Sequence, residues 1–166
     1  MNRKHFLTAA GAFAFGSSLA IKNNLAEDHD NNIVYRKPPY LKHGDVIGIT
    51  SPAGFITFEE IQPAKAVIES WGYHILPGTS IGKRNFTFGG TDKERLGDLQ
   101  QMLDNPKIKA IMCARGGYGT IRIVDRLSWT KFIAKPKWLI GFSDITVLHN
   151  HIHSNCKIAT IHSKMT

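Results

Sequence analysis

Short apolar runs alternate along the chain with stretches whose apolar residues recur at helical spacing. Five runs have the length and composition of buried strands, and they cover residues 46–50, 73–76, 108–114, 138–141 and 158–161. Between them, apolar residues return every three to four positions, as on the buried face of a helix. These stretches contain Ile61, Ala64, Val67, Ile68 and Trp71; Leu96, Leu99 and Leu103; residues 121–127; and Ile145, Leu148 and Ile152. The pattern predicts strands and helices in alternation.

Two of the predicted helices carry start signals in the sequence. Thr57 and Glu60 precede the first helical stretch with the spacing of a capping box, and Thr91 and Glu94 precede the second. The second helix is then stopped by Pro106, because a proline cannot continue the helical hydrogen bonds.

Alternation of this kind predicts an α/β fold, with a parallel sheet covered by helices on both faces. The arrangement is flavodoxin-like or class I glutamine-amidotransferase-like. Right-handed crossovers bring the carboxyl ends of all strands to one edge, and ligands in such sheets bind outside that edge. Three unusual turns follow strands, at residues 51–54, 115–119 and 141–144, so we expect them to meet there.

The N-terminus has the features of an export signal. Arg3 and Lys4 precede a short apolar run that ends in small residues at Ala20. It resembles a twin-arginine signal, with Lys4 where the second arginine usually stands. We therefore predict a signal peptide at 1–20, a linker at 21–37 and a folded domain at 38–166. The protein is then periplasmic, or cytoplasmic if the signal is not functional; an N-terminus that is disordered or packs on the domain is the alternative.

Composition and charge narrow the function classes. The 166 residues suffice for one domain with a core, at 42% hydrophobic and 20% charged residues. The net charge is +8, but Lys and Arg are scattered without interleaved aromatics, so we expect no nucleic-acid partner. Cys113 and Cys156 have no metal-binding spacing and do not settle the redox compartment.

The turn at 141–144 suggests nucleophilic chemistry. An apolar run ends in Gly141, Ser143 follows, and a helical pattern begins at Ile145. A serine on a sharp strand-to-helix turn is lifted out of the sheet edge, where amides of the next turn can hold an oxyanion. The alternative is that Ser143 only caps the helix. The convergence of three turns favours the nucleophile.

Other parts of such a site are also present in the sequence. The amide of Asp144 is one natural oxyanion donor, and a second can come from the Gly116–Gly117 turn. That glycine turn matches neither common nucleotide-binding motif, so a phosphate site is the weaker reading. His149 and His153 share a helix face, but without an acidic third ligand we interpret them as surface or cap histidines. His162 is a weak candidate for the base.

Four motifs together resemble a known family. They are Ser51-Pro52-Ala53, Gly89-Gly90-Thr91-Asp92-Lys93-Glu94-Arg95, Ala114-Arg115-Gly116-Gly117-Tyr118-Gly119 and Gly141-Phe142-Ser143-Asp144. Their order and spacing are similar to those of bacterial L,D-carboxypeptidases, the serine peptidases that include murein tetrapeptide carboxypeptidase and microcin-immunity hydrolases. The resemblance covers about residues 38–165.

The resemblance implies specific roles. Ser143 is the nucleophile, and backbone N–H groups of Gly117 and Asp144 form the oxyanion hole. We expect Arg115, Gly116 and Ser51 to contact substrate, a murein tetrapeptide that loses its terminal D-alanine in peptidoglycan recycling or remodelling. No metal or cofactor is implied.

In this family a second, C-terminal domain supplies the glutamate and histidine of the triad. The sequence ends at Thr166, so we expect it to carry the nucleophile half, with little activity unless that domain, or a separately encoded one, is present. Two alternatives remain: a non-catalytic module that binds a peptide or another subunit, and an unrelated flavodoxin-like binding domain. A homodimer also remains open.

Overall fold

The computed structural model describes residues 34–166. The predicted signal peptide at 1–20 and most of the predicted linker lie outside these residues. Tyr35 and Arg36, which were predicted to belong to the linker, contact the domain. The Tyr35 ring stacks on His153 at 4.0 Å, and the Arg36 N–H donates to Lys157 O at 2.9 Å. The folded part therefore begins before the predicted Pro38.

A parallel five-stranded sheet forms the centre of the domain, in the order β2-β1-β3-β4-β5. The strands are β1 (Val46–Thr50), β2 (His74–Pro77), β3 (Ile108–Cys113), β4 (Trp138–Gly141) and β5 (Ile161–His162). The predicted α/β class with a parallel sheet is confirmed. Because every strand runs the same way, the turns that follow β1, β3 and β4 lie at one edge of the sheet.

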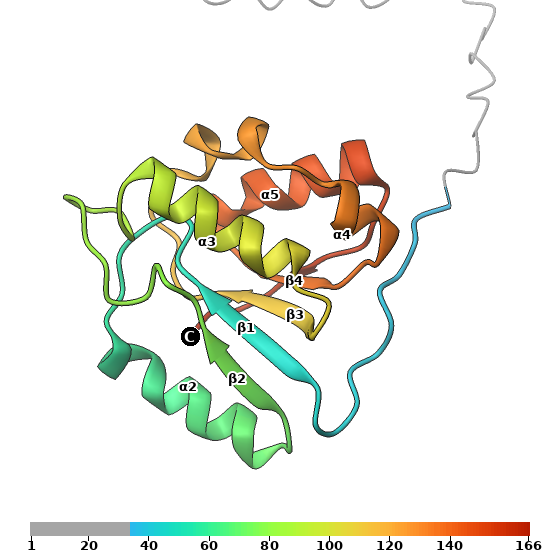
Figure 1. The fold of residues 1–166 in the computed structure, drawn as a ribbon, viewed down its shortest axis with the longest axis horizontal. Helices are drawn as coiled ribbons and strands as arrows, with labels where there is room; N and C mark the ends of the chain where they lie inside the picture. The colour runs from blue at the N-terminus through green and yellow to red at the C-terminus, as the bar shows by residue number, and fades with distance from the viewer. Residues whose placement is uncertain (1–33) are drawn as a thin grey trace, which may run out of the picture. The chain divides into compact units, whose positions relative to one another are not determined.

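Helices cover both faces of this sheet, as predicted (Figure 1). The longer ones are α2 (Phe58–Ser70) and α3 (Asp92–Asp104), and the shorter ones are α4 (Thr130–Ala134) and α5 (Thr146–His151). Helix α2 packs on one face, where its Ile61 and Ile68 join Ile47 and Ile49 of β1. Helices α3, α4 and α5 pack on the other face. None of the helices in residues 34–166 is long and apolar enough to cross a bilayer.

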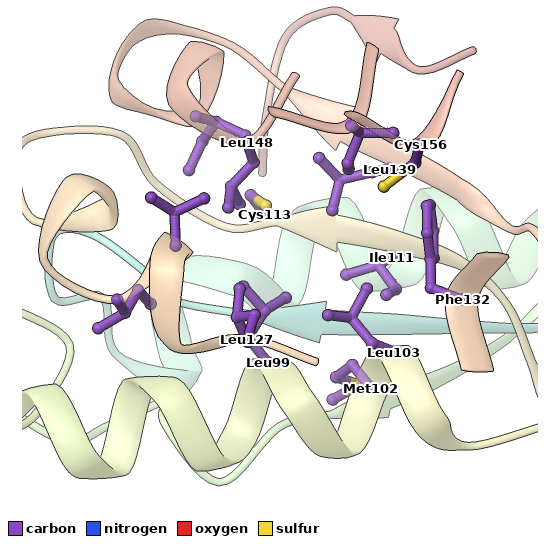
Figure 2. Packing of buried hydrophobic residues seen from close by; sticks show 14 of the residues in the cluster. Leu99, Met102, Leu103, Ile111, Cys113, Leu127, Phe132, Leu139, Leu148 and Cys156 are labelled. Carbon is purple, nitrogen blue, oxygen red and sulfur yellow. The ribbon is translucent and has the colours of Figure 1, made fainter. Parts of the chain in front are cut away.

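The larger core lies between the sheet and α3, α4 and α5 (Figure 2). Side chains alternate along β3, so that Ile111 and Cys113 point into this core while Ala110 faces α2. Burial raises the pKa of the Cys113 thiol, which suits a small apolar core residue. This packing fixes the strand ends from which the three turns emerge.

Both predicted capping boxes are confirmed. The hydroxyls of Thr57 and Thr91 accept from the backbone N–H groups of Glu60 and Glu94, whose carboxylates accept from the two threonine N–H groups in return. Hydrogen bonds from Lys83 and from Thr91 lower the pKa of Glu94 to about 2.

Three predicted elements differ from the observed ones. The helix predicted at 121–127 consists of two 3-10 turns, Thr120–Arg122 and Val124–Arg126. The strand predicted at 158–161 is reduced to β5, and Ile158 forms only an isolated bridge with Arg36. The helix after Ser143 is a 3-10 turn (Ser143–Ile145), then α5, then a π-turn (Ile152–Cys156). In each case the apolar spacing identifies buried residues but not the hydrogen-bond pattern.

Candidate functional site

The turn between β4 and α5 places Ser143 in a strained conformation. Its φ angle is +61°, in the left-handed region that a serine adopts at a cost of about 1–2 kcal/mol. A Cβ atom on Gly141 would lie 2.8 Å from Ile145 Cγ2, so a larger residue there would have to displace the Ile145 side chain or the turn. The Ser143 side chain is exposed. A strained, exposed serine between a strand and a helix has the geometry of a nucleophile elbow, as predicted.

The glycine turn after β3 lies directly against this serine. A Cβ atom on Gly116 would come within 2.9 Å of Ser143 Cβ and 3.1 Å of its Oγ. Gly117 and Gly119 both have positive φ angles, 111° and 128°, which other residues rarely adopt. The Gly54 N–H donates to Gly116 O at 2.8 Å, which joins the turn after β1 to the other two. The predicted convergence of the three turns is therefore confirmed.

Asp144 links the elbow to the end of the glycine turn. Its Oδ2 accepts from the Thr120 N–H at 2.9 Å and from the Thr120 hydroxyl at 2.7 Å. The same hydroxyl lies 2.7 Å from the Asp144 carbonyl oxygen. The Asp144 carboxylate thus has a structural task, and the backbone N–H groups of Asp144 and Gly117 stay predicted as oxyanion donors.

Arg115 and Ser51 were both predicted to contact substrate. The structure leaves the first accessible and buries the second. Arg115 is exposed, and its Nη1 makes two weak contacts, with Phe55 O at 3.4 Å and with Glu60 Oε1 at 3.6 Å. Ser51 is fully buried; its hydroxyl donates to Gly54 O and its N–H donates to Ser80 Oγ. A peptide at this edge can reach Arg115 but not the Ser51 side chain, so we correct the role of Ser51 to shaping the turn.

His149 is not the surface or cap residue predicted from its helical spacing. It is 7% exposed, and its Nε2 lies 2.9 Å from Gly141 O while Nδ1 lies 2.8 Å from Thr160 Oγ1. The tautomer with a proton on Nε2 satisfies both contacts, since the ring then donates to the carbonyl and accepts from the hydroxyl. Burial lowers the pKa of His149. This residue anchors the strand that leads into Ser143.

The other two candidate histidines, His153 and His162, are exposed. His153 stacks on Tyr35. His162, on β5, has its ring 6.2 Å from that of Phe142, the residue before Ser143, and 5.8 Å from that of His149. The structure thus brings His162 to the correct edge, and its role as a base stays a prediction. Within residues 34–166, no three His, Cys, Asp or Glu side chains are grouped so that they could hold a metal ion.

Arg95 and Asp98 on α3 have no counterpart among the predicted functional residues. Both are buried. Arg95 donates to Pro52 O and Gly119 O, in the turns after β1 and β3, and Asp98 accepts from Thr50, the last residue of β1. Arg95 belongs to a motif that carried the family resemblance, but nothing in the sequence indicated what it contacts.

A cavity of about 920 Å³ in the described part of the chain lies elsewhere. Its lining includes Asp45, Pro106 and Lys137, each of which stands just before a strand. It contains none of the three turns. The chemistry of the turns, and not cavity volume, therefore locates the candidate site.

Comparison with known proteins agrees with this assignment. Residues 47–163 match the LD-carboxypeptidase N-terminal domain of the peptidase S66 family. The chain is 35% identical over 129 residues to the probable murein peptide carboxypeptidase of Bacillus subtilis (strain 168), a match that covers 78% of this chain and 40% of that protein. It is 36% identical over 110 residues to the murein tetrapeptide carboxypeptidase of Pseudomonas aeruginosa, covering 64% of this chain and 35% of the relative.

A solved structure shows the same fold. The MccF-like protein from Bacillus anthracis str. Ames superposes with a TM-score of 0.70 at 27% identity, over 75% of this chain and 39% of that one. The chain spans about 40% of the length of the curated relatives it matches. The matched range contains all three turns of the candidate site. The chain therefore belongs to the LD-carboxypeptidase family and carries its N-terminal domain.

Proposed function

We propose that the protein is a serine-type L,D-carboxypeptidase that releases the terminal D-alanine from a murein tetrapeptide, in peptidoglycan recycling or remodelling. The observation that carries this proposal is the pairing of Ser143, at φ +61°, with Gly116, whose missing side chain leaves room beside the hydroxyl. The names of the Bacillus and Pseudomonas relatives support a murein peptide as substrate.

In the proposed reaction, Ser143 Oγ attacks the carbonyl carbon of the residue before D-alanine, and its proton passes to a base. The negative charge that develops on the carbonyl oxygen is stabilised by the N–H groups of Asp144 and Gly117. The base gives this proton to the D-alanine nitrogen as the C–N bond breaks, so that D-alanine leaves as an amine. Water then hydrolyses the acyl-serine, which restores the Ser143 hydroxyl and leaves a carboxylate on the shortened peptide. No step requires a metal ion.

Arg115 is the group best placed to recognise the free carboxylate that marks a carboxypeptidase substrate. It directly precedes Gly116, and its side chain is 53% exposed. Its contact with Glu60, itself half-exposed, is worth little in water. A guanidinium can instead bind a carboxylate with two parallel hydrogen bonds. We infer that a terminal carboxylate displaces Glu60 from Arg115 when substrate binds.

The base and its orienting acid are proposed to come from the second domain of the family. A serine hydroxyl is a weak nucleophile until an oriented base accepts its proton, and oxyanion donors cannot replace that base. His162 lies at the same edge of the sheet, where its ring is near those of Phe142 and His149, and none of the described carboxylates pairs with it. We therefore expect residues 34–166 alone to be a poor catalyst.

The experiment joins this chain to the second domain of the Bacillus subtilis relative and measures D-alanine release from a murein tetrapeptide. The rate of release should exceed that of the unfused chain by several orders of magnitude, because loss of the triad base and acid lowers the rate of a serine peptidase by that much. Ser143→Ala in the fusion should abolish the gain. Equal rates with and without the second domain would refute the proposal that this domain supplies the base. His162 would then be the first residue to mutate. Tight binding of tetrapeptide without hydrolysis would favour a non-catalytic binding module.

Export to the periplasm is part of the proposal. It rests on the sequence of residues 1–20, and N-terminal sequencing of protein recovered from cells tests it. A mature N-terminus near residue 21 is expected; an intact Met1 in a soluble cytoplasmic pool would contradict export.

A further inference from the structure

Two buried charged residues lie one helical turn apart on α3, beneath the candidate site. The side chains of Arg95 and Asp98 are 0% and 2% exposed. Charged residues are almost never buried to this extent unless their partners are specific. The proposed reaction gives neither of them a chemical step.

Arg95 joins the turn after β1 to the turn after β3. Its Nη1 donates to Pro52 O at 2.5 Å and to Gly119 O at 2.9 Å, while Nη2 donates to Asp92 Oδ1 at 2.5 Å. The guanidinium carbon also lies 5.0 Å from the centre of the Phe88 ring. A Cβ atom on Gly119 would lie 2.8 Å from Arg95 Nη1, so the glycine turn is shaped to admit this side chain.

Asp98 fixes the other side of the turn after β1. Its carboxylate accepts from Thr50 Oγ1 at 2.6 Å, from Ser80 Oγ at 2.5 Å and from the Thr79 N–H at 2.7 Å. Ser80 Oγ in turn accepts from the Ser51 N–H at 2.8 Å. The carboxylate is thus held by hydroxyl and amide donors, and it positions the first residue of the 51–54 turn.

These bonds continue to the nucleophile. The 51–54 turn donates from the Gly54 N–H to Gly116 O, and Gly116 lies against Ser143. We propose that Arg95 and Asp98 are positioning residues, which hold the glycine turn at 115–119 where its amides can receive the oxyanion. This inference rests on the proposed function for its catalytic consequence. A misplacement of about 1 Å at such a group can cost roughly a hundredfold in rate.

The first test needs no activity and uses the protein as it is. Amide hydrogen exchange is measured for Arg95→Lys, Arg95→Gln and Asp98→Asn. Arg122→Gln is the matched control, because Arg122 pairs with the same Asp92 and lies over the same Phe88 ring, while its side chain is exposed. Exchange at Gly54 and at residues 116–120 should accelerate at least about tenfold in the Arg95 and Asp98 variants, relative to Ile111 in β3, and not in the control.

Equal acceleration at Ile111 and at the turn would mean that these residues only stabilise the fold, and it would overturn the inference. Unchanged exchange at the turn would overturn it too. Since Arg95→Gln and Asp98→Asn risk unfolding, Ser80→Ala is made alongside them. It removes the acceptor of the Ser51 N–H together with one donor to Asp98, and it leaves Arg95 and its contacts in place. Exchange at Gly54 must still rise if the inference holds.

The second test uses the fusion with the second domain. Arg95→Lys should lower kcat roughly ten- to a hundredfold while KM stays within about threefold, because the oxyanion contact is made mainly in the transition state. Arg122→Gln should keep both constants near those of the unsubstituted fusion. A fusion that never hydrolyses tetrapeptide would refute the proposed function and leave the exchange result to decide the inference. An active fusion whose kcat is unchanged by Arg95→Lys would refute this inference and leave the proposed function standing.

Discussion

Gly116 lies so close to Ser143 that a Cβ atom at position 116 would come within 2.9 Å of the serine Cβ. The two residues follow different strands, β3 and β4, which are neighbours in the sheet. Their contact is the point at which the glycine turn and the elbow become one site.

Gly116→Ala should therefore damage the site. The added methyl must displace either Ser143 or the glycine turn, and overpacking of this kind typically costs about 1–3 kcal/mol. D-alanine release by the fusion should fall at least tenfold, and the urea midpoint should drop. Gly97→Ala is the control, because a Cβ atom on this α3 residue meets nothing within 4 Å. It should raise stability by about 0.5–1 kcal/mol and leave the rate unchanged. A Gly116→Ala enzyme with full activity would refute the contact.

The strain at Ser143 predicts that replacing this serine with glycine relieves backbone strain while it abolishes activity. Ser143→Gly should be more stable than Ser143→Ala by about 1 kcal/mol, because only glycine adopts a positive φ without cost. Both variants should be inactive. Lys157→Gly is the matched control, since Lys157 also has a positive φ, 55°, away from the site. It should gain stability and retain activity. The stabilities are measured by urea unfolding. Equal midpoints for Ser143→Gly and Ser143→Ala would contradict the claim that the backbone at Ser143 is strained.

The sequence predicted the parts of this site that depend on strand order. Alternating strands and helices, right-handed crossovers and the glycine-rich turns were enough to bring Arg115, Gly116 and Ser143 to one edge. The two capping boxes were also predictable, because they are local and need only a threonine and a glutamate at fixed spacing.

The remaining features depend on contacts between distant residues. Arg95 reaches Pro52 and Gly119, which are far from it in sequence, and its neighbours on α3 give no sign of this. The helical spacing of His149 is that of a surface residue. Its burial depends on Thr160, eleven residues later, whose hydroxyl lies 2.8 Å from His149 Nδ1. The 3-10 turns replaced a predicted helix because apolar spacing marks burial, not hydrogen-bond length.

Thr120 should stabilise the elbow through Asp144. Thr120→Val keeps the shape of the buried side chain but removes the hydroxyl that donates at 2.7 Å to Asp144 Oδ2. The expected loss is about 1–2 kcal/mol, since the partly buried Asp144 carboxylate loses a charge-assisted hydrogen bond. Thr130→Val, at an exposed hydroxyl with only a 3.5 Å contact to Ser128, should change stability by less than about 0.5 kcal/mol. Equal effects of the two substitutions in urea unfolding would show that the Thr120–Asp144 contact does not hold the elbow.

The neutral His149 ring predicts acid sensitivity. Burial lowers its pKa in the folded state, so the unfolded chain binds the proton more readily. Its contribution to stability is present above the unfolded pKa, about 6.5, and is lost as pH falls below it. The urea midpoint should decline from pH 7.5 to pH 5, and His149→Gln should flatten that decline.

The control for this pH dependence is His153→Gln, which changes an exposed ring stacked on Tyr35 and should keep the decline. The lowered pKa of Asp92, caused first by its hydrogen bond from Arg122, acts at lower pH, near and below the usual carboxyl range. A decline that survives in His149→Gln would assign the acid sensitivity to another group.

The identity of the nucleophile can be measured directly by mapping a covalent adduct. The fusion with the second domain is treated with an aryl phosphonate ester analogue of the murein tetrapeptide, in which attack of the serine Oγ on phosphorus expels the aryloxide. The protein is then digested and analysed by mass spectrometry. The account predicts one adduct, on the peptide that contains Ser143, together with loss of D-alanine release and no adduct in Ser143→Ala. An adduct on another residue, or an active fusion that still hydrolyses tetrapeptide after Ser143→Ala, would contradict it.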